Sequence, residues 1–266
     1  MEAVRAAALA IALILWTLVL LPVQLFAVIT GLRLQRVIPR LYHRGNCWLL
    51  GLNVRRQGAD TASAPVLYVA NHASYLDILV LSTLLDASFV AKAEVAGWPL
   101  FGFLAKSVNT IFVERRPSRS GGQRDQMRVR LEKGQSLILF PEGTSSDGNR
   151  VLPFNSTFFS LAEMSVNGAP LCVQPISLAY TRYNHLPMSR RDRPYLAWYG
   201  DMGLAGHLWD LLCRGPATVE VFFHPPLVLG DGGSRKVLAK RCESLVTGGV
   251  SDLLSGRLSR VVAKPA

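Results

Sequence analysis

The sequence predicts an α/β protein in which a mostly parallel central sheet is covered by helices, with an N-terminal membrane-associating helix or helical hairpin. Three observations lead to this fold class. Short apolar runs rich in β-branched residues recur along the chain, stretches of helical character separate them, and one long uncharged segment precedes them all. Continuous apolar strands that alternate with helices are typical of a parallel sheet buried on both faces.

The N-terminal segment carries much of the hydrophobic excess. Residues 6–32 contain no Asp, Glu, Lys, Arg or His, and at ~1.5 Å per residue they are long enough to cross a ~30 Å hydrocarbon core. A shallow hairpin broken near Pro22 and a cleaved signal peptide are the alternatives. The signal peptide fits less well, because the apolar run far exceeds the ~7–15 residues of such peptides.

A basic segment follows the apolar one. It holds six arginines and no acidic residue: Arg33, Arg36, Arg40, Arg44, Arg55 and Arg56. The positive-inside rule therefore places the chain from residue 33 onward on the cytoplasmic side, where each arginine near anionic headgroups contributes about 1 kcal/mol. We divide the chain into a membrane anchor at 1–32, a basic juxtamembrane linker at 33–60 and one α/β domain at 61–266.

The elements of the α/β domain follow in order. Each expected strand is a short β-branched or aromatic run bounded by Gly, Pro, Asn or Asp. The expected strands cover 65–70, 109–114, 136–140, 173–180 and 218–223. The expected helices cover about 76–86, 120–133, 156–165, 204–213 and 234–254, and the last of them is expected to pack back on the sheet.

Composition and missing motifs exclude several classes. A chain that is 50% hydrophobic is not disordered, and its four cysteines form neither a CxxC pair nor a zinc pattern, so no metal is expected. The net charge of +11 indicates a membrane surface or an acidic partner, but no groove-reading motif points to nucleic acid. The sequence also lacks GxSxG, HExxH, GxGxxG and Walker A patterns, which argues against serine hydrolases, zinc proteases, dinucleotide enzymes and P-loop NTPases.

A first polar cluster, NHASYLD at 71–77, comes directly after the expected strand 65–70. Sites in open α/β sheets lie beyond the carboxyl ends of the strands. His72 and Asp77 would lie ~140° apart on one continuous helix, so they meet only if His72 lies in the loop and Asp77 in the first helical turn. An imidazole held by a carboxylate is a general base, and without a protein nucleophile it can deprotonate a substrate hydroxyl.

A second polar cluster, FPEGTSSDG at 140–148, follows the expected strand 136–140. Pro141 and Gly143 favour a turn, and Glu142 is a carboxylate in an apolar setting. Hydroxyl groups stand at Thr144, Ser145 and Ser146. Such a turn can bind an oxyanion or a polar headgroup, although an ordinary strand-to-helix turn with a capping residue is the alternative.

Four motifs occur in order along the chain: the HX4D pair of His72 and Asp77, FVERR at 112–116, FPEGT at 140–144 and VQPISLAY at 173–180. Together they resemble the four ordered blocks of the PlsC-like glycerolipid acyltransferase family. The resemblance covers roughly residues 65–180. It implies an α/β fold with a membrane-associating N-terminal segment. It also implies transfer of a fatty acyl group from acyl carrier protein or coenzyme A to a lysolipid hydroxyl, with no cofactor besides the donor.

The resemblance also implies roles for individual residues. His72 would be the general base and Asp77 its orienting partner. Residues implied in binding the acceptor or in organising its site are Arg115, Glu142, Gly143 and Thr144, and Pro175 would lie near the acyl-binding region. Family members that take lysophosphatidic acid usually continue the third block with arginine, but here that position is Ser145, which weakens the recognition of a phosphate.

Longer strings point to the acceptor. EGTSSDGNRVLP at 142–153, KAEVAGWPLFGFLAK at 92–106 and AYTR at 179–182 resemble bacterial lyso-ornithine lipid acyltransferases. Asp147 would then face the ornithine ammonium, and Arg115 or Arg116 its carboxylate. In the alternative, Arg150 restores a phosphate site and the product is phosphatidic acid.

The resemblance and the arginine asymmetry together place the protein in the bacterial inner membrane, with the catalytic domain facing the cytoplasm. The basic run 115–133 is either a solvated helix face or a docking surface for acyl carrier protein, which is acidic. A lipid hydrolase that uses the same His-Asp pair to activate water and a non-catalytic membrane scaffold are the rival functions.

Overall fold

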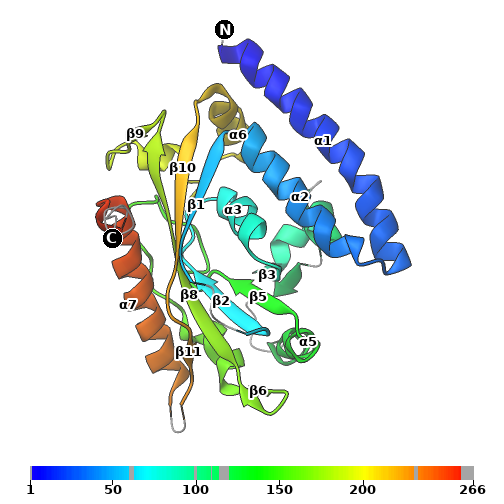
Figure 1. The fold of residues 1–266 in the computed structure, drawn as a ribbon, viewed down its shortest axis with the longest axis vertical. Helices are drawn as coiled ribbons and strands as arrows, with labels where there is room; N and C mark the ends of the chain where they lie inside the picture. Colours follow the sequence, from blue (N-terminus) through cyan, green and yellow to red (C-terminus); the bar gives the residue numbers. More distant parts are fainter. Residues whose placement is uncertain are drawn as a thin grey trace, which may run out of the picture.

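The computed structural model describes residues 2–59, 63–98, 101–108, 110–113, 120–230 and 233–258. It confirms the α/β fold class: a mostly parallel central sheet is flanked by helices, and a long apolar helix leads the chain (Figure 1). The main strands lie side by side in the order β1-β10-β8-β2-β5-β3-β4. Strands β8, β2, β5, β3 and β4 are parallel, whereas β10 is antiparallel to β8 and pairs in parallel with β1.

The strands of this sheet agree closely with the expected ones and add two more. They are β1 (Leu52–Gly58), β2 (Val66–Ala70), β3 (Ala87–Lys92), β4 (Ile111–Val113), β5 (Ser136–Leu139), β8 (Cys172–Tyr183) and β10 (Ala217–Phe223). Short pairings occur at β6 (Ser165–Val166), β7 (Ala169–Pro170), β9 (Leu186–Pro187) and β11 (Leu227–Val228). Strands β1 and β3 were not expected: the segment 33–60, expected as a linker, instead forms α2 and β1.

Helices occupy the expected stretches with small shifts, and α2 and α4 are additional ones that were not expected. They are α1 (Glu2–Thr30), α2 (Leu34–Leu49), α3 (Leu76–Leu84), α4 (Phe101–Ser107), α5 (Ser120–Glu132), α6 (Leu204–Cys213) and α7 (Arg235–Leu254). Short 3-10 helices occur at η1 (Ala93–Gly97), η3 (Ser156–Glu163) and η4 (Arg193–Tyr195). The helix expected at 156–165 is therefore η3, a 3-10 helix.

The sheet is buried on both faces, which explains the continuous apolar runs of its central strands. In β2, Val66 and Tyr68 belong to the apolar cluster that contains residues of α2, α3 and α6, whereas Leu67 and Val69 belong to the cluster with α5, α7 and η3. This alternation has the period of two expected of a strand. Figure 1 shows α7 on one side of the sheet and α2 and α3 on the other.

Helices α1 and α2 form an antiparallel hairpin. The Trp16 indole N–H donates to the Tyr42 carbonyl at 3.1 Å, and the Gln24 side-chain amide donates to the Gln35 carbonyl at 3.2 Å. The chain reverses at Gly31, whose φ of 68° suits glycine. Pro22 lies inside α1, so the alternative of a hairpin broken near Pro22 was wrong.

Helix α1 is long and apolar enough to cross a membrane, and it also contacts α2, α4 and α6. At its N-terminal end, the Arg5 guanidinium donates to the carbonyls of Cys213 and Arg214 at the end of α6. The opposite face of α1 is apolar and exposed, including Ile11, Leu15 and Leu18. The hairpin therefore lies against the α/β domain while it presents an apolar surface outward.

The pairing of β1 with β10 can be tested at Gly58, which has φ of 74° and faces Phe223. A Cβ added there would lie 2.2 Å from the Phe223 carbonyl oxygen. Gly200 also has a positive φ, of 60°, but its added Cβ would meet open space. We expect Gly200→Ala to lower the free energy of unfolding by about 1 kcal/mol, and Gly58→Ala by a further ~1–3 kcal/mol.

Thermal unfolding of the wild type and of both variants, all in one detergent, measures the difference between the two losses of stability. Equal losses would contradict the close approach of β1 to β10.

Candidate active site

The two polar clusters meet at the carboxyl ends of β2 and β5. The loop that carries His72 begins at Asn71, whose side chain continues the pairing between β2 and β8. Its amide donates to the Leu178 carbonyl at 2.9 Å, and its carbonyl oxygen accepts from the Leu178 N–H at 2.8 Å. The loop therefore leaves the sheet in a fixed direction.

His72 and Asp77 form a hydrogen-bonded pair. The His72 Nδ1 lies 2.9 Å from the Asp77 Oδ2, with His72 in the loop and Asp77 in the first turn of α3. Because a carboxylate only accepts, the neutral imidazole donates from Nδ1 and keeps its lone pair on Nε2. The His72 side chain is 19% exposed and that of Asp77 is 0% exposed, so a substrate reaches the imidazole and not the carboxylate.

Asp77 is held from several directions. Its Oδ2 also accepts from the backbone N–H groups of Ala73 at 2.7 Å and Ser74 at 2.9 Å. Its Oδ1 accepts from the Tyr180 hydroxyl at 2.6 Å. Burying a carboxylate is costly unless it is hydrogen-bonded, and these donors compensate for that cost. The same bonds fix the carboxylate, and through it the His72 ring.

An aromatic stack supports the other side of the imidazole. The Phe140 ring lies parallel to the His72 ring, with 4.1 Å between centroids and 15° between planes. Phe140 in turn stacks on Phe89 at 6.0 Å. The imidazole is thus fixed by a hydrogen bond at its edge and by an apolar contact on its face.

Glu142 holds the backbone around His72 by hydrogen bonds to two N–H groups. Its Oε1 accepts from the His72 N–H at 2.8 Å, and its Oε2 accepts from the Leu152 N–H at 2.9 Å. The Ser146 N–H donates to the His72 carbonyl at 2.9 Å, so the loop after β5 holds both backbone groups of His72. Burial raises the pKa of Glu142 to about 8 and the Asp77 charge adds to the rise, while the two backbone hydrogen bonds oppose it.

The remaining residues of the second cluster have varied environments. Gly143 has φ of 68°, which fits the expected turn, and Thr144 is exposed. The Ser145 hydroxyl donates to the Trp198 carbonyl at 2.5 Å, so it links this loop to the segment before α6. The Asp147 carboxylate accepts from the Asn149 backbone N–H at 3.1 Å and from its side-chain amide at 3.3 Å. The structure thus brings His72, Asp77 and Glu142 together, with Ser145 and Asp147 on the adjoining loop.

The other predicted positions are Arg115, Arg116 and Pro175. Arg115 lies outside the described residues, as does Arg116. Pro175 lies in β8, where it pairs with Val69 of β2.

The sequence did not identify Tyr180, Phe140 or Asn71 as parts of the site. Each stands inside or next to one of the motifs quoted above, so proximity in sequence was the available signal. Their roles depend on β8 lying beside β2, and strand order cannot be read from strand positions alone. The sequence also did not identify Trp198, whose backbone N–H donates to the Ala73 carbonyl at 2.8 Å.

Comparisons with known proteins identify the family of the chain. The family model described as Acyltransferase matches residues 52–179, a range that begins with β1. A lyso-ornithine lipid O-acyltransferase of Rhizobium meliloti is 41% identical over 98% of this chain and 90% of that protein. The lyso-ornithine lipid O-acyltransferase of Brucella abortus is 40% identical over 84% and 85%.

More distant relatives share the fold or part of the sequence. A 1-acyl-sn-glycerol-3-phosphate acyltransferase of Neisseria gonorrhoeae is 30% identical over 76% of each chain. The crystal structure of the 1-acyl-sn-glycerophosphate acyltransferase PlsC from Thermotoga maritima matches all of both chains with a TM-score of 0.61 at 19% identity, which shows a shared fold. On the sequence relationships, the chain belongs to the PlsC-like acyltransferase family and is an acyltransferase.

Proposed function

We propose that this acyltransferase is membrane-bound and transfers a fatty acyl group from acyl carrier protein or coenzyme A to the free hydroxyl of lyso-ornithine lipid. The observation that carries the reaction is the His72–Asp77 pair, whose Nε2 is available as a base. In the described part of the chain, no serine, threonine or cysteine side chain is hydrogen-bonded to His72. This favours a substrate hydroxyl as the nucleophile.

The proposed reaction has two steps. The His72 Nε2 takes the proton of the acceptor hydroxyl while its oxygen attacks the thioester carbonyl, forming a C–O bond and a tetrahedral oxyanion. The oxyanion then collapses, the C–S bond breaks, and the thiolate takes the proton from the imidazolium. Asp77 stabilises the imidazolium between the steps, and backbone N–H groups of the two loops are the proposed donors to the oxyanion.

Two features favour an acceptor without a phosphate. The relatives at 41% and 40% identity are named for lyso-ornithine lipid. Ser145 stands where family members that take lysophosphatidic acid usually have an arginine, and its hydroxyl already donates a hydrogen bond to the Trp198 carbonyl. Asp147 is the proposed partner of the ornithine ammonium, and Arg115 of its carboxylate. The alternative acceptor is 1-acyl-sn-glycerol-3-phosphate, which the Neisseria relative supports.

The hairpin of α1 and α2 is the proposed membrane attachment, at the cytoplasmic face of a bacterial inner membrane. Contacts of α1 with α2, α4 and α6 favour a hairpin embedded in one leaflet over a separate span. Its exposed apolar residues supply the surface that inserts. The basic helix α5 is the proposed dock for acyl carrier protein, with Arg128 and Lys133 exposed on or directly after it.

Acceptor preference is tested with the purified enzyme, acyl carrier protein as donor carrier, and both acceptors in the same mixed micelles. We expect kcat/KM for lyso-ornithine lipid to exceed that for 1-acyl-sn-glycerol-3-phosphate by at least about tenfold, since an unpaired phosphate loses a charged hydrogen bond. His72→Ala, with a turnover lowered ~10²–10⁴-fold, is the control for contaminating activity. Equal or faster synthesis of phosphatidic acid would overturn the proposed acceptor.

Tyr180 is proposed as a positioning residue that acts through Asp77. We expect Tyr180→Phe to lower kcat about tenfold with little change in the acceptor KM, because a hydrogen bond to a charged group is lost.

Tyr183→Phe is the matched control for this prediction. It removes a hydroxyl on the same strand that accepts from the Gly215 N–H, away from Asp77. We expect an unchanged kcat and an unchanged acceptor KM. If the two variants behaved alike, Tyr180 would have only a structural role.

A further inference from the structure

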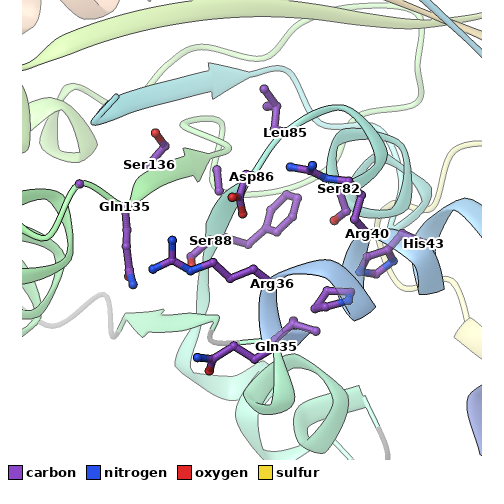
Figure 2. Close-up of a pocket in the computed structure, with 15 residues that line it drawn as sticks. Gln35, Arg36, Arg40, His43, Ser82, Leu85, Asp86, Ser88, Gln135 and Ser136 are labelled. Atoms are coloured by element: carbon purple, nitrogen blue, oxygen red, sulfur yellow. The ribbon is translucent and has the colours of Figure 1, made fainter. Parts of the chain in front are cut away.

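A polar pocket lies at the end of the sheet opposite to the candidate active site. It is enclosed between α2 and the starts of β3 and β5 (Figure 2). Its volume of about 120 Å³ is several times the ~10–15 Å³ that a single water requires. The polar residues that line it include Arg36, Arg40, His43, Asp86, Ser88 and Gln135.

The pocket has an excess of positive charge. Arg36 and Arg40 lie one turn apart on α2, and Figure 2 shows both side chains extending from that helix into the pocket. Arg130 of α5 reaches the pocket wall, where it donates to the Ser88 hydroxyl at 3.4 Å. Asp86 is the carboxylate among these lining residues. Guanidinium groups bind phosphates through paired N–H donors, so this arrangement favours an anion.

His43 gives a second indication of a ligand. His43 lines the pocket and as a whole residue is only 8% exposed, and its Nδ1 has no hydrogen-bond partner within the described residues. A buried polar atom without a partner is unfavourable, and such atoms are rare in proteins. Burial lowers the pKa of His43 to about 4, so the imidazole is neutral and offers one N–H donor. An anion between this imidazole and the two arginines would satisfy it.

The position of the pocket on α2 indicates the source of the anion. Leu34, Val37 and Leu41 are exposed on the neighbouring face of α2, by 39%, 57% and 45%. Residues at this spacing form one stripe of a helix, and the stripe adjoins the row of Arg36 and Arg40. With the apolar stripe in contact with acyl chains, the two arginines lie at the level of the headgroups.

We propose that this pocket is a second, non-catalytic site that binds the phosphate of an anionic membrane phospholipid. The proposal depends on the membrane attachment described above and not on the acyl acceptor. Its function is to orient the hairpin on an anionic membrane through one bound headgroup, in addition to diffuse attraction by the arginines.

Binding to vesicles tests the proposal with two variants of equal charge. Arg36→Gln/Arg40→Gln removes the pocket arginines, and Arg33→Gln/Arg44→Gln removes two others of the same segment that do not line it. Vesicles of phosphatidylcholine with a minor fraction of phosphatidylglycerol are compared with phosphatidylcholine alone. We expect the pocket variant to lose at least about tenfold more affinity for the anionic vesicles than the control. Equal losses would overturn the site, because diffuse electrostatics would explain them.

A milder variant covers the case in which the double variant fails to fold. Gln135→Glu is close in size and adds a carboxylate to the pocket, so it should weaken anionic-vesicle binding in the same direction. Unchanged binding by a folded Gln135→Glu variant would contradict the proposal. Activity measured on lyso-ornithine lipid in detergent micelles reports on the active site separately from this binding.

The two sources of phosphate are separated in detergent solution by calorimetric titration. Soluble short-chain phosphatidylglycerol should bind the wild type and lose at least about tenfold in affinity with the pocket variant. Inorganic phosphate should bind the wild type much more weakly than the lipid, because it lacks the contacts next to α2. Equal or tighter binding of inorganic phosphate would assign the site to the free ion and overturn the lipid.

Discussion

The buried carboxylate of Asp77 is the constraint on which the site depends. It is fully removed from solvent, and it is compensated by four donors: the His72 ring, two N–H groups of the loop after β2, and the Tyr180 hydroxyl. Three of those donors belong to the loop after β2, and the fourth belongs to β8, so the carboxylate is fully satisfied only when β8 lies beside β2 and α3 begins at the end of that loop. The Asp77 carboxylate therefore links the position of β8 beside β2 to the orientation of the proposed base.

A second carboxylate joins the two loops. Glu142 accepts one backbone N–H at His72 and another at Leu152, which closes the loop after β5 upon itself and against the loop after β2. A carboxylate stands in this apolar turn because it accepts hydrogen bonds from both of these backbone N–H groups. It also explains why Glu142 is better placed to organise the loops than to contact an acceptor, since both of its oxygens are occupied.

Much of this arrangement could be predicted from the sequence. The apolar runs at β2, β5, β8 and β10 are buried on both faces, which is why continuous hydrophobicity revealed them, and the place of His72 after a strand identified the dyad. Strand β1 was missed because it is an edge strand with arginines on its exposed positions. Tyr180 was missed because its partner is 103 residues away in sequence, and strand order is a tertiary property. Helix α1 continues through Pro22, and the hairpin turn forms at Gly31, where a positive φ suits glycine.

Direct transfer by a general base passes through no acyl-enzyme. The most direct test mixes stoichiometric enzyme with a fatty acyl thioester in the absence of acceptor, and follows the protein by intact-mass spectrometry and the release of free thiol. Direct transfer predicts unmodified protein, no rapid burst of thiol, and ester formation only after lysolipid is added. A covalently acylated protein that forms in one enzyme equivalent and then transfers its acyl group to lysolipid would contradict it.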